Sequence, residues 1–131
     1  MSKPLILCVD DETVILDSLK GQLKEEFGDT YLYDVTESAE EALELIEELQ
    51  EEHIDIIVIV SDWLMPGMKG DEFLIQVHNQ FPKIIKIMLT GQADNEAVER
   101  AKTLANLHRC LYKPWDRQEL VETIKSGLAT L

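Results

Sequence analysis

Short apolar runs alternate along the chain with longer stretches in which apolar residues recur every three or four positions. The short runs are typical of β-strands, and they lie at residues 5–9, 31–35, 54–60, 84–89 and 109–112. The first and third runs are almost continuously apolar, which predicts central parallel strands buried on both faces. Residues 31–35 alternate between apolar and polar positions, which predicts an edge strand.

Helical spacing fills the intervals between these runs. One apolar stripe, which stops at Gly28, consists of Val14, Ile15, Leu19, Leu23 and Phe27. Ser38 and Glu41 match a capping box, and they begin a helix whose stripe is Ala42, Leu45, Ile46 and Leu49. Three more helices are expected, one around Phe73, Leu74 and Val77, one over residues 94–106, and one that Asp116 caps.

Strands that alternate with helices predict an α/β fold with helices on both faces of a parallel sheet. We therefore expect a single domain over residues 1–131. Its expected architecture is a doubly wound, flavodoxin-like five-stranded sheet with strand order 2-1-3-4-5. In such a sheet, ligands bind outside the carboxyl ends of the strands.

Polar residues stand where four of the predicted strands end. Asp10 and Asp11 follow the first strand, Asp62 the third, Thr90 the fourth and Lys113 the fifth. Each has an ordinary structural explanation when taken alone, such as a helix cap for the Asp pair or a turn for Asp62. Their joint occurrence at neighbouring strand ends favours one shared site.

The residue types at these strand ends indicate a particular chemistry. Three carboxylates brought together repel one another, and a hard divalent cation relieves that repulsion. Oxygen ligands suit Mg²⁺, which often bridges to a phosphate. A carboxylate beside the ion can attack phosphorus and form an acyl phosphate, while a lysine and a threonine hydroxyl compensate the charge on the phosphoryl oxygens.

The net charge of the chain disfavours some classes of binding partner. The chain has 12 Lys and Arg against 26 Asp and Glu, a formal net charge of −14, which disfavours direct binding to nucleic acid or to an anionic membrane. Cys8 and Cys110 lie in separate apolar runs without a CxxC neighbour, and no apolar stretch is long enough to cross a membrane. We therefore expect a cytoplasmic protein without disulfides.

Part of the negative charge forms a solvated helix face, made of Glu40, Glu41, Glu44, Glu47, Glu48, Glu51 and Glu52.

Four motifs stand at the strand ends, and the D-x-x-M-P-x-M-x-G stretch is the most specific of them. They are Val9-Asp10-Asp11-Glu12, Asp62-Trp63-Leu64-Met65-Pro66-Gly67-Met68-Lys69-Gly70, Leu89-Thr90-Gly91 and Tyr112-Lys113-Pro114-Trp115. These motifs resemble those of the receiver domain of two-component response regulators, and the resemblance covers roughly residues 4–128.

This resemblance implies roles for the acidic residues. Asp62 is the expected phosphoacceptor and also a ligand of the metal. Asp11 is the expected direct Mg²⁺ ligand, and Asp10 is expected to help through a water molecule. The backbone carbonyl of Leu64 would complete the ligands that the protein supplies.

The resemblance implies roles for three further residues. Thr90 is expected to form a hydrogen bond to one phosphoryl oxygen, and Lys113 to pair with another. Gln92, together with Leu64, lies beside the site in the sequence and is expected to tune the lifetime of the phosphorylated form.

A signalling switch, rather than an enzyme that turns over external substrates, is what the resemblance implies. A sensor histidine kinase or a phosphotransfer protein donates the phosphoryl group, and the receiver itself catalyses the transfer and a slow hydrolysis. Phosphorylation draws Thr90 toward the phosphoryl group and changes the face made by the fourth helix, fifth strand and fifth helix. That face is expected to control a downstream effector or a covalently linked output domain, or to pair two copies as a homodimer.

Three positions depart from the family pattern, of which Gly91, in place of the commoner Ala, is a mild variant that keeps a small residue near the phosphate. Many members carry Tyr or Phe three residues before the lysine, where this chain has Cys110. A cysteine is too small to rotate into the aromatic's place, so the usual relay from threonine to aromatic is not expected. Trp115, after Lys113-Pro114, is expected to pack against the last helix rather than to anchor a partner.

Two other classes of protein share parts of the pattern. A phosphohydrolase of the haloacid dehalogenase type also uses an aspartyl nucleophile, Mg²⁺ and a lysine, but it needs D-x-D where this chain has adjacent Asp10 and Asp11. A flavodoxin-like cofactor binder needs a first loop that cradles phosphate, and Asp-Asp-Glu would repel that anion. Within the receiver family, a stand-alone protein and the amino-terminal part of a longer effector both stay open.

Overall fold

The apolar runs form a single sheet in the computed structural model, which describes residues 3–91 and 95–131. In this part of the chain, five parallel strands lie in the order β2-β1-β3-β4-β5, which confirms the predicted fold class and strand order. Observed bounds differ from the predicted ones by no more than two residues. The strands are β1 (Leu5–Val9), β2 (Leu32–Thr36), β3 (Ile56–Asp62), β4 (Ile85–Thr90) and β5 (Arg109–Tyr112).

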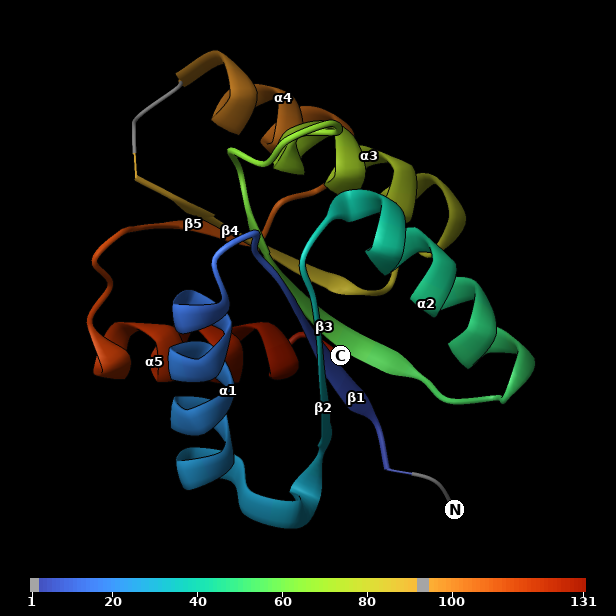
Figure 1. The fold of residues 1–131 in the computed structure, drawn as a ribbon, viewed down its shortest axis with the longest axis vertical. Coiled ribbons are helices and arrows are strands. Elements are labelled where there is room, and N and C mark those ends of the chain that lie inside the picture. The colour runs from blue at the N-terminus through green and yellow to red at the C-terminus, as the bar shows by residue number, and fades with distance from the viewer. Residues whose placement is uncertain (1–2, 92–94) are drawn as a thin grey trace.

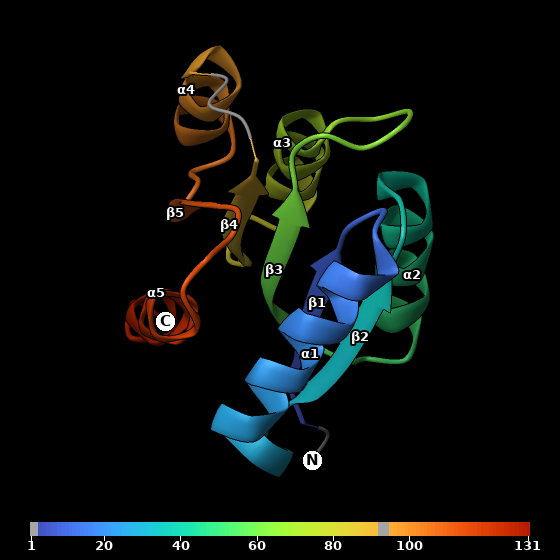
Figure 2. The same cartoon turned by 60° about the vertical axis from the view of Figure 1, so that its left-hand side comes forward.

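Helices cover both faces of the sheet, as Figure 1 and Figure 2 show. One face carries α1 and α5, and the other carries α2, α3 and α4. Residue 94, the expected first residue of the fourth helix, lies outside the described residues. The helices are α1 (Thr13–Phe27), α2 (Ala39–Glu51), α3 (Gly70–Gln80), α4 (Asn95–Leu104) and α5 (Arg117–Leu128), and a short 3₁₀ turn, η1 (Gly28–Thr30), follows α1.

Burial follows from the position of each strand. Every residue of β1 and β4 is buried, because helices lie above and below them. β2 is an edge strand with exposed positions, as its alternating pattern predicts. Alternate side chains of the central strands enter two cores, one against α1 and α5 and the other against α2, α3 and α4. The sheet is therefore held rigidly, and its strand ends are fixed in space.

The predicted stripe of α1 is partly wrong. Leu16, Leu19 and Leu23 are the buried residues of this helix, whereas Val14 is 73% exposed. Val14 precedes Leu16 by two positions, which places it about 200° away around the helix axis. A stripe that contains Leu16 therefore points Val14 toward solvent.

The two predicted helix caps have different outcomes. The Ser38 Oγ accepts a hydrogen bond from the Glu41 N–H at 3.1 Å, and Glu41 Oε2 accepts one from the Glu37 N–H at 2.9 Å. The capping box is thus confirmed, with its return bond shifted to Glu37. Asp116 stands at the N-cap of α5, but its side chain makes no capping hydrogen bond, and the helix begins through the Asp116 carbonyl, which accepts from the Leu120 N–H at 3.0 Å.

Both cysteines are free thiols, with Cys8 buried and Cys110 half-buried. Burial raises the pKa of Cys8 to about 12, which keeps its thiol protonated and unreactive. The seven glutamates of the acidic face around α2 are all exposed, as predicted. In the part of the chain that the structure describes, no helix has the length and apolar character needed to cross a membrane.

Candidate functional site

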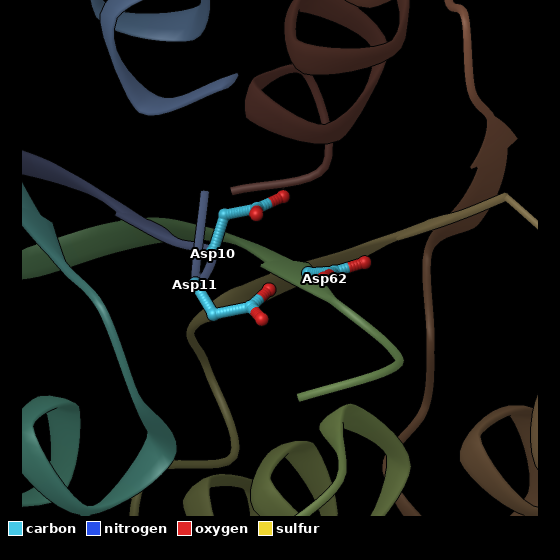
Figure 3. Close-up of side chains that lie close together, drawn as sticks. All are labelled: Asp10, Asp11 and Asp62. Atoms are coloured by element: carbon cyan, nitrogen blue, oxygen red, sulfur yellow. The ribbon is translucent and has the colours of Figure 1, made fainter. Parts of the chain in front are cut away.

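The acidic residues at the ends of β1 and β3 converge on one edge of the sheet. Asp10, Asp11 and Asp62 each present a carboxylate oxygen, and these oxygens all lie within 4.8 Å of one another. Figure 3 shows the three side chains projecting side by side beyond the strand ends. Asp10 is fully buried and Asp62 is 4% exposed, whereas Asp11 is exposed.

Lys113 approaches this cluster from the end of β5. Its Nζ lies 2.8 Å from Asp10 Oδ2 and 3.1 Å from Asp62 Oδ1. The backbone sets this position, because the Lys113 N–H donates to the Thr90 carbonyl at 2.8 Å, which extends the pairing of β5 with β4. The predicted acidic residues and the predicted lysine therefore meet at one place.

Asp10 is held by contacts on both carboxylate oxygens. Oδ2 accepts from Lys113, and Oδ1 accepts from the Glu12 N–H at 2.9 Å. The Asp10 N–H donates to the Thr36 carbonyl at 3.1 Å. The pattern of polar residues at the strand ends does not distinguish Asp10 from its neighbour Asp11, but the structure gives the first a buried ion pair and leaves the second at the surface.

The surroundings shift the pKa of Asp62 upward. Burial is the largest cause and the charge of Asp10 the next, and together they outweigh the attraction of Lys113, so that the pKa rises from 3.8 to about 6. Burial also lowers the pKa of Lys113, but the hydrogen bond to Asp10 and the charge of Asp62 reverse this, and its pKa is raised. One ammonium thus faces two buried carboxylates, which leaves negative charge uncompensated at this edge.

A pocket of about 270 Å³ opens beside Asp62. Thr90, which is 2% exposed, also contributes to the pocket. The other lining residues are Glu12, Trp63, Leu64, Gly91 and Lys113. A larger pocket of about 460 Å³ lies near Gln50, Phe81 and Leu131, but none of the three clustered aspartates lines it. The chemistry therefore points to the smaller pocket.

The loop after β3 is shaped by a close approach of two backbones. A Cβ atom added at Gly70 would collide with the carbonyl oxygen of Asp62 and would lie 2.8 Å from Trp63 Cα. The Gly70 N–H also donates to the Trp63 carbonyl at 2.7 Å. The glycine that ends the D-x-x-M-P-x-M-x-G stretch is thus required because α3 begins directly against the residue that carries the candidate acceptor.

The structure says less about two residues that are expected to contribute to the site, Leu64 and Gln92. Leu64 is 52% exposed and lines the pocket, so the role of its carbonyl as a metal ligand stays a prediction. Gln92 lies outside the described residues.

Trp115 is half-buried against the core of α1 and α5, and its Nε1 donates to Gln22 Oε1 of α1 at 2.8 Å.

Sequence reasoning missed a second group of polar residues next to the site. Trp63 Nε1 donates to Asp71 Oδ1 at 3.2 Å, and Arg100 Nη1 donates to Asp71 Oδ2 at 2.9 Å. The sequence signal was weak, since a charged residue in the first turn of a helix usually needs no explanation beyond solvent exposure and the helix dipole. Asp71 is nevertheless buried, at 5% exposed.

The comparison with known families decides among the classes of protein that share this chemistry. The model of the response regulator receiver domain matches residues 6–125. The chain belongs to this family. The match gives no support to the phosphohydrolase alternative.

Solved receiver domains have the same architecture. The signal receiver domain of an HD domain-containing protein from Pseudomonas fluorescens Pf-5 is 30% identical, with a TM-score of 0.88 over 98% of this chain and 97% of that one. A CheY-like response regulator receiver domain protein from Methanospirillum hungatei JF-1 is 34% identical, with a TM-score of 0.85 over 98% of this chain and 96% of that one.

Curated relatives of this receiver domain are longer proteins. The hydrogenase transcriptional regulatory protein HoxA of Cupriavidus necator is 33% identical over 123 residues, which are 94% of this chain and 24% of HoxA. The chain thus spans about a quarter of the length of that relative.

Proposed function

We propose that this receiver domain is a signalling switch of a two-component system, in which Asp62 accepts a phosphoryl group in a reaction that depends on Mg²⁺. The observation that carries the proposal is the meeting of three carboxylates and one lysine at the carboxyl edge of the sheet, next to a pocket. In an open α/β sheet this edge is where ligands bind.

Among the three aspartates, Asp62 is the best candidate for the acceptor. It lines the pocket, whereas neither Asp10 nor Asp11 does. Asp10 is fully buried, with both carboxylate oxygens engaged. Asp11 is exposed, so it lacks the water-excluded surroundings that favour attack on phosphorus. Asp62 alone combines burial with access to the pocket.

The proposed transfer moves a phosphoryl group from nitrogen to oxygen. A carboxylate oxygen of Asp62 attacks the phosphorus of a phosphohistidine on the donor protein. The P–N bond breaks, and the imidazole nitrogen leaves with the electron pair and takes up a proton. Hydrolysis later removes the phosphoryl group. Water attacks the phosphorus, the bond to Asp62 breaks, and inorganic phosphate departs. The receiver returns to its starting carboxylate.

The donor set at this edge fits Mg²⁺. All candidate ligands are oxygens, and three carboxylates against one ammonium leave an excess of negative charge. We assign Asp11 and Asp62 as direct ligands, with Asp10 acting through a water molecule and the Leu64 carbonyl completing the set. When bound, the cation would supply positive charge to the phosphoryl oxygens.

Lys113 and Thr90 serve the phosphoryl group in this proposal. The Lys113 ammonium already lies 3.1 Å from Asp62 Oδ1, so it is close enough to form an ion pair with a phosphoryl oxygen once Asp62 carries the group. Thr90 lies in the same pocket, and its hydroxyl is suited to donate a hydrogen bond to a second oxygen. Both residues are held at strand ends, and little reorganisation is needed when charge develops.

We further propose a sensor histidine kinase or phosphotransfer protein as the donor, and a downstream effector or a linked output domain as the target. HoxA is named a transcriptional regulatory protein, which supports an output in gene control. The net charge of −14 argues that this receiver domain does not itself bind nucleic acid. A cytoplasmic location and a homodimer through the face of α4, β5 and α5 stay predictions.

Incubation with acetyl phosphate, read by intact mass, tests the proposal. The wild type should gain one phosphoryl adduct in the presence of Mg²⁺ and should gain none when EDTA is added beforehand. Asp62→Asn should gain none, and Asp11→Asn should gain much less. Glu44→Gln on the exposed acidic face serves as a control that removes the same charge away from the site. An adduct on Asp62→Asn would refute the choice of acceptor.

A further inference from the structure

Trp63, the residue that follows Asp62, is tied to β4 and to α3. Its N–H donates to the Leu89 carbonyl at 2.8 Å, and its carbonyl accepts from the Gly70 N–H at 2.7 Å. The indole is buried, and its Nε1 donates to Asp71 Oδ1 at 3.2 Å. These contacts connect the backbone beside Asp62 to the Asp71 side chain.

Asp71 in turn joins α3 to α4. Its Oδ2 accepts from Arg100 Nη1 at 2.9 Å, so each carboxylate oxygen holds one partner. The Asp71 side chain is 7% exposed and that of Arg100 is 55% exposed. Since a buried carboxylate is costly without its partners, the contact with Arg100 contributes to holding α4 against α3.

Apolar packing gives α4 comparatively little support. Its buried residues are Ala97, Val98 and Ala101, which are small side chains. The stabilisation from burial scales with apolar area, so this helix gains less than α3, which buries Phe73, Leu74 and Val77. A polar link to α3 is therefore a larger share of what fixes the position of α4.

We propose that Asp71 and Arg100 are positioning residues that couple the state of Asp62 to the position of α4 through Trp63. This inference rests on the proposed function, because the signal that enters the coupling is the phosphoryl group on Asp62. The link takes the place of the aromatic relay, for which Cys110 is too small.

The direction of the coupling follows from the pocket. Trp63 lines the pocket that the phosphoryl group enters, so the added group lies against the residue whose indole donates to Asp71. In this proposal the entering phosphoryl group displaces Trp63, and the hydrogen bonds from Trp63 to Asp71 and from Arg100 to Asp71 oppose that displacement. Coupling between two sites is reciprocal. Removing the link therefore favours phosphorylation, just as phosphorylation loosens the link.

The test compares Arg100→Gln with Lys102→Gln in the full chain. Lys102 lies on the same helix, is 54% exposed, and contacts only Glu99 of its own helix at 3.6 Å among the ion pairs of the described residues. Both variants lose one positive charge. Each protein is treated with acetyl phosphate and Mg²⁺, the phosphorylated fraction is read by intact mass, and hydrogen exchange is followed in the peptide that covers α4 with and without the phosphoryl group.

With acetyl phosphate and acetate both in large excess, so that phosphoryl exchange reaches equilibrium, Arg100→Gln should raise the ratio of phosphorylated to unphosphorylated protein by about fivefold or more, the lower end of common coupling strengths. Its α4 peptide should exchange quickly in both states, whereas the wild type and Lys102→Gln should show faster exchange only after phosphorylation. Trp63→Phe, which removes the N–H donor, should raise this ratio likewise, but its α4 peptide should exchange slowly in both states because the contact between Asp71 and Arg100 remains. Merely weaker packing would speed exchange without changing the phosphorylated fraction.

Two results would overturn the inference, and they differ in kind. If Arg100→Gln forms the adduct only to the wild-type level, or if its α4 still responds to phosphorylation, the coupling is wrong and the proposed function stands. If the wild type forms no adduct at all, the proposed function fails and the coupling fails with it.

Discussion

The Nζ of Lys113 lies 3.1 Å from Oδ1 of Asp62 and thereby joins the end of β5 to the end of β3. The same atom lies 2.8 Å from Asp10 Oδ2, so one ammonium separates two buried carboxylates. The lysine therefore stabilises the resting protein as well as the proposed reaction, and these two roles can be measured separately.

Replacing Lys113 by Met should lower the free energy of unfolding at pH 7 by about 3 kcal/mol, because two buried carboxylates would lose their common partner. Urea denaturation in EDTA measures this loss. Lys102→Met, which breaks an exposed pair, should change stability by less than about 0.5 kcal/mol. Equal effects of the two substitutions would show that the buried ion pair contributes nothing beyond a surface contact.

Mg²⁺ should raise the melting temperature of the wild type. A ligand that binds only the folded state at ten times its Kd stabilises that state by about 1.4 kcal/mol, and relief of the repulsion among the three aspartates is the source of the binding. Asp11→Asn should lose most of the increase, while Glu44→Gln should keep it. An equal increase in all three proteins would place the ion away from this edge.

Two glycines should respond to alanine in opposite ways. Gly70→Ala should destabilise the protein by about 2 kcal/mol or more, since the new methyl group meets backbone atoms of Asp62 and Trp63 that cannot move aside easily. Gly21→Ala in the middle of α1 meets nothing within 4 Å and should stabilise by about 0.5–1 kcal/mol. Thermal unfolding of both variants checks the pair, and a stabilised Gly70→Ala would disprove the close approach.

The buried Lys86 predicts a dependence of stability on pH. It is 1% exposed, its Nζ donates to the Ile84 carbonyl at 2.6 Å, and burial lowers its pKa from 10.5 to about 8. Between these two values the unfolded chain binds a proton that the folded protein does not, so the contribution of Lys86 to stability rises with pH. At pH 7 both states are charged, and the folded protein carries the full cost of the buried charge.

Lys86→Met should accordingly be more stable than the wild type at pH 7, by about 1–3 kcal/mol, and its advantage should shrink as pH rises from about 8 to 10.5. Urea denaturation across this range measures the difference. Lys83→Met, at an exposed position, should show no such trend. An advantage of Lys86→Met that stays constant with pH would mean that the ammonium is already solvated in the folded protein.

Much of the fold and the acidic cluster could be predicted from the sequence, because both depend on local periodicity. Continuous apolar runs identify central strands, and a parallel sheet brings their carboxyl ends to one edge. The convergence of Asp10, Asp62 and Lys113 follows from that topology without knowledge of any side-chain conformation.

The remaining features depend on how elements are rotated and how closely they approach, which the pattern does not encode. The choice of Asp10 over Asp11 as the partner of Lys113 is set by the direction in which the chain leaves β1. The contact between Asp71 and Arg100 depends on the rotation of α3 and α4 about their axes. A stripe that omits Leu16 predicts a buried Val14, whereas the burial of Leu16 fixes the rotation of α1 and leaves Val14 exposed.

The central claim is that the phosphoryl group resides on Asp62, and reduction of the acyl phosphate tests it most directly. The wild type is treated with acetyl phosphate and Mg²⁺, then with borohydride, which converts a phosphorylated aspartate into homoserine, and the digested peptides are sequenced by mass spectrometry. Our account predicts homoserine at position 62 and unchanged aspartates at positions 10 and 11. Homoserine at position 10 or 11, with Asp62 intact, would contradict it.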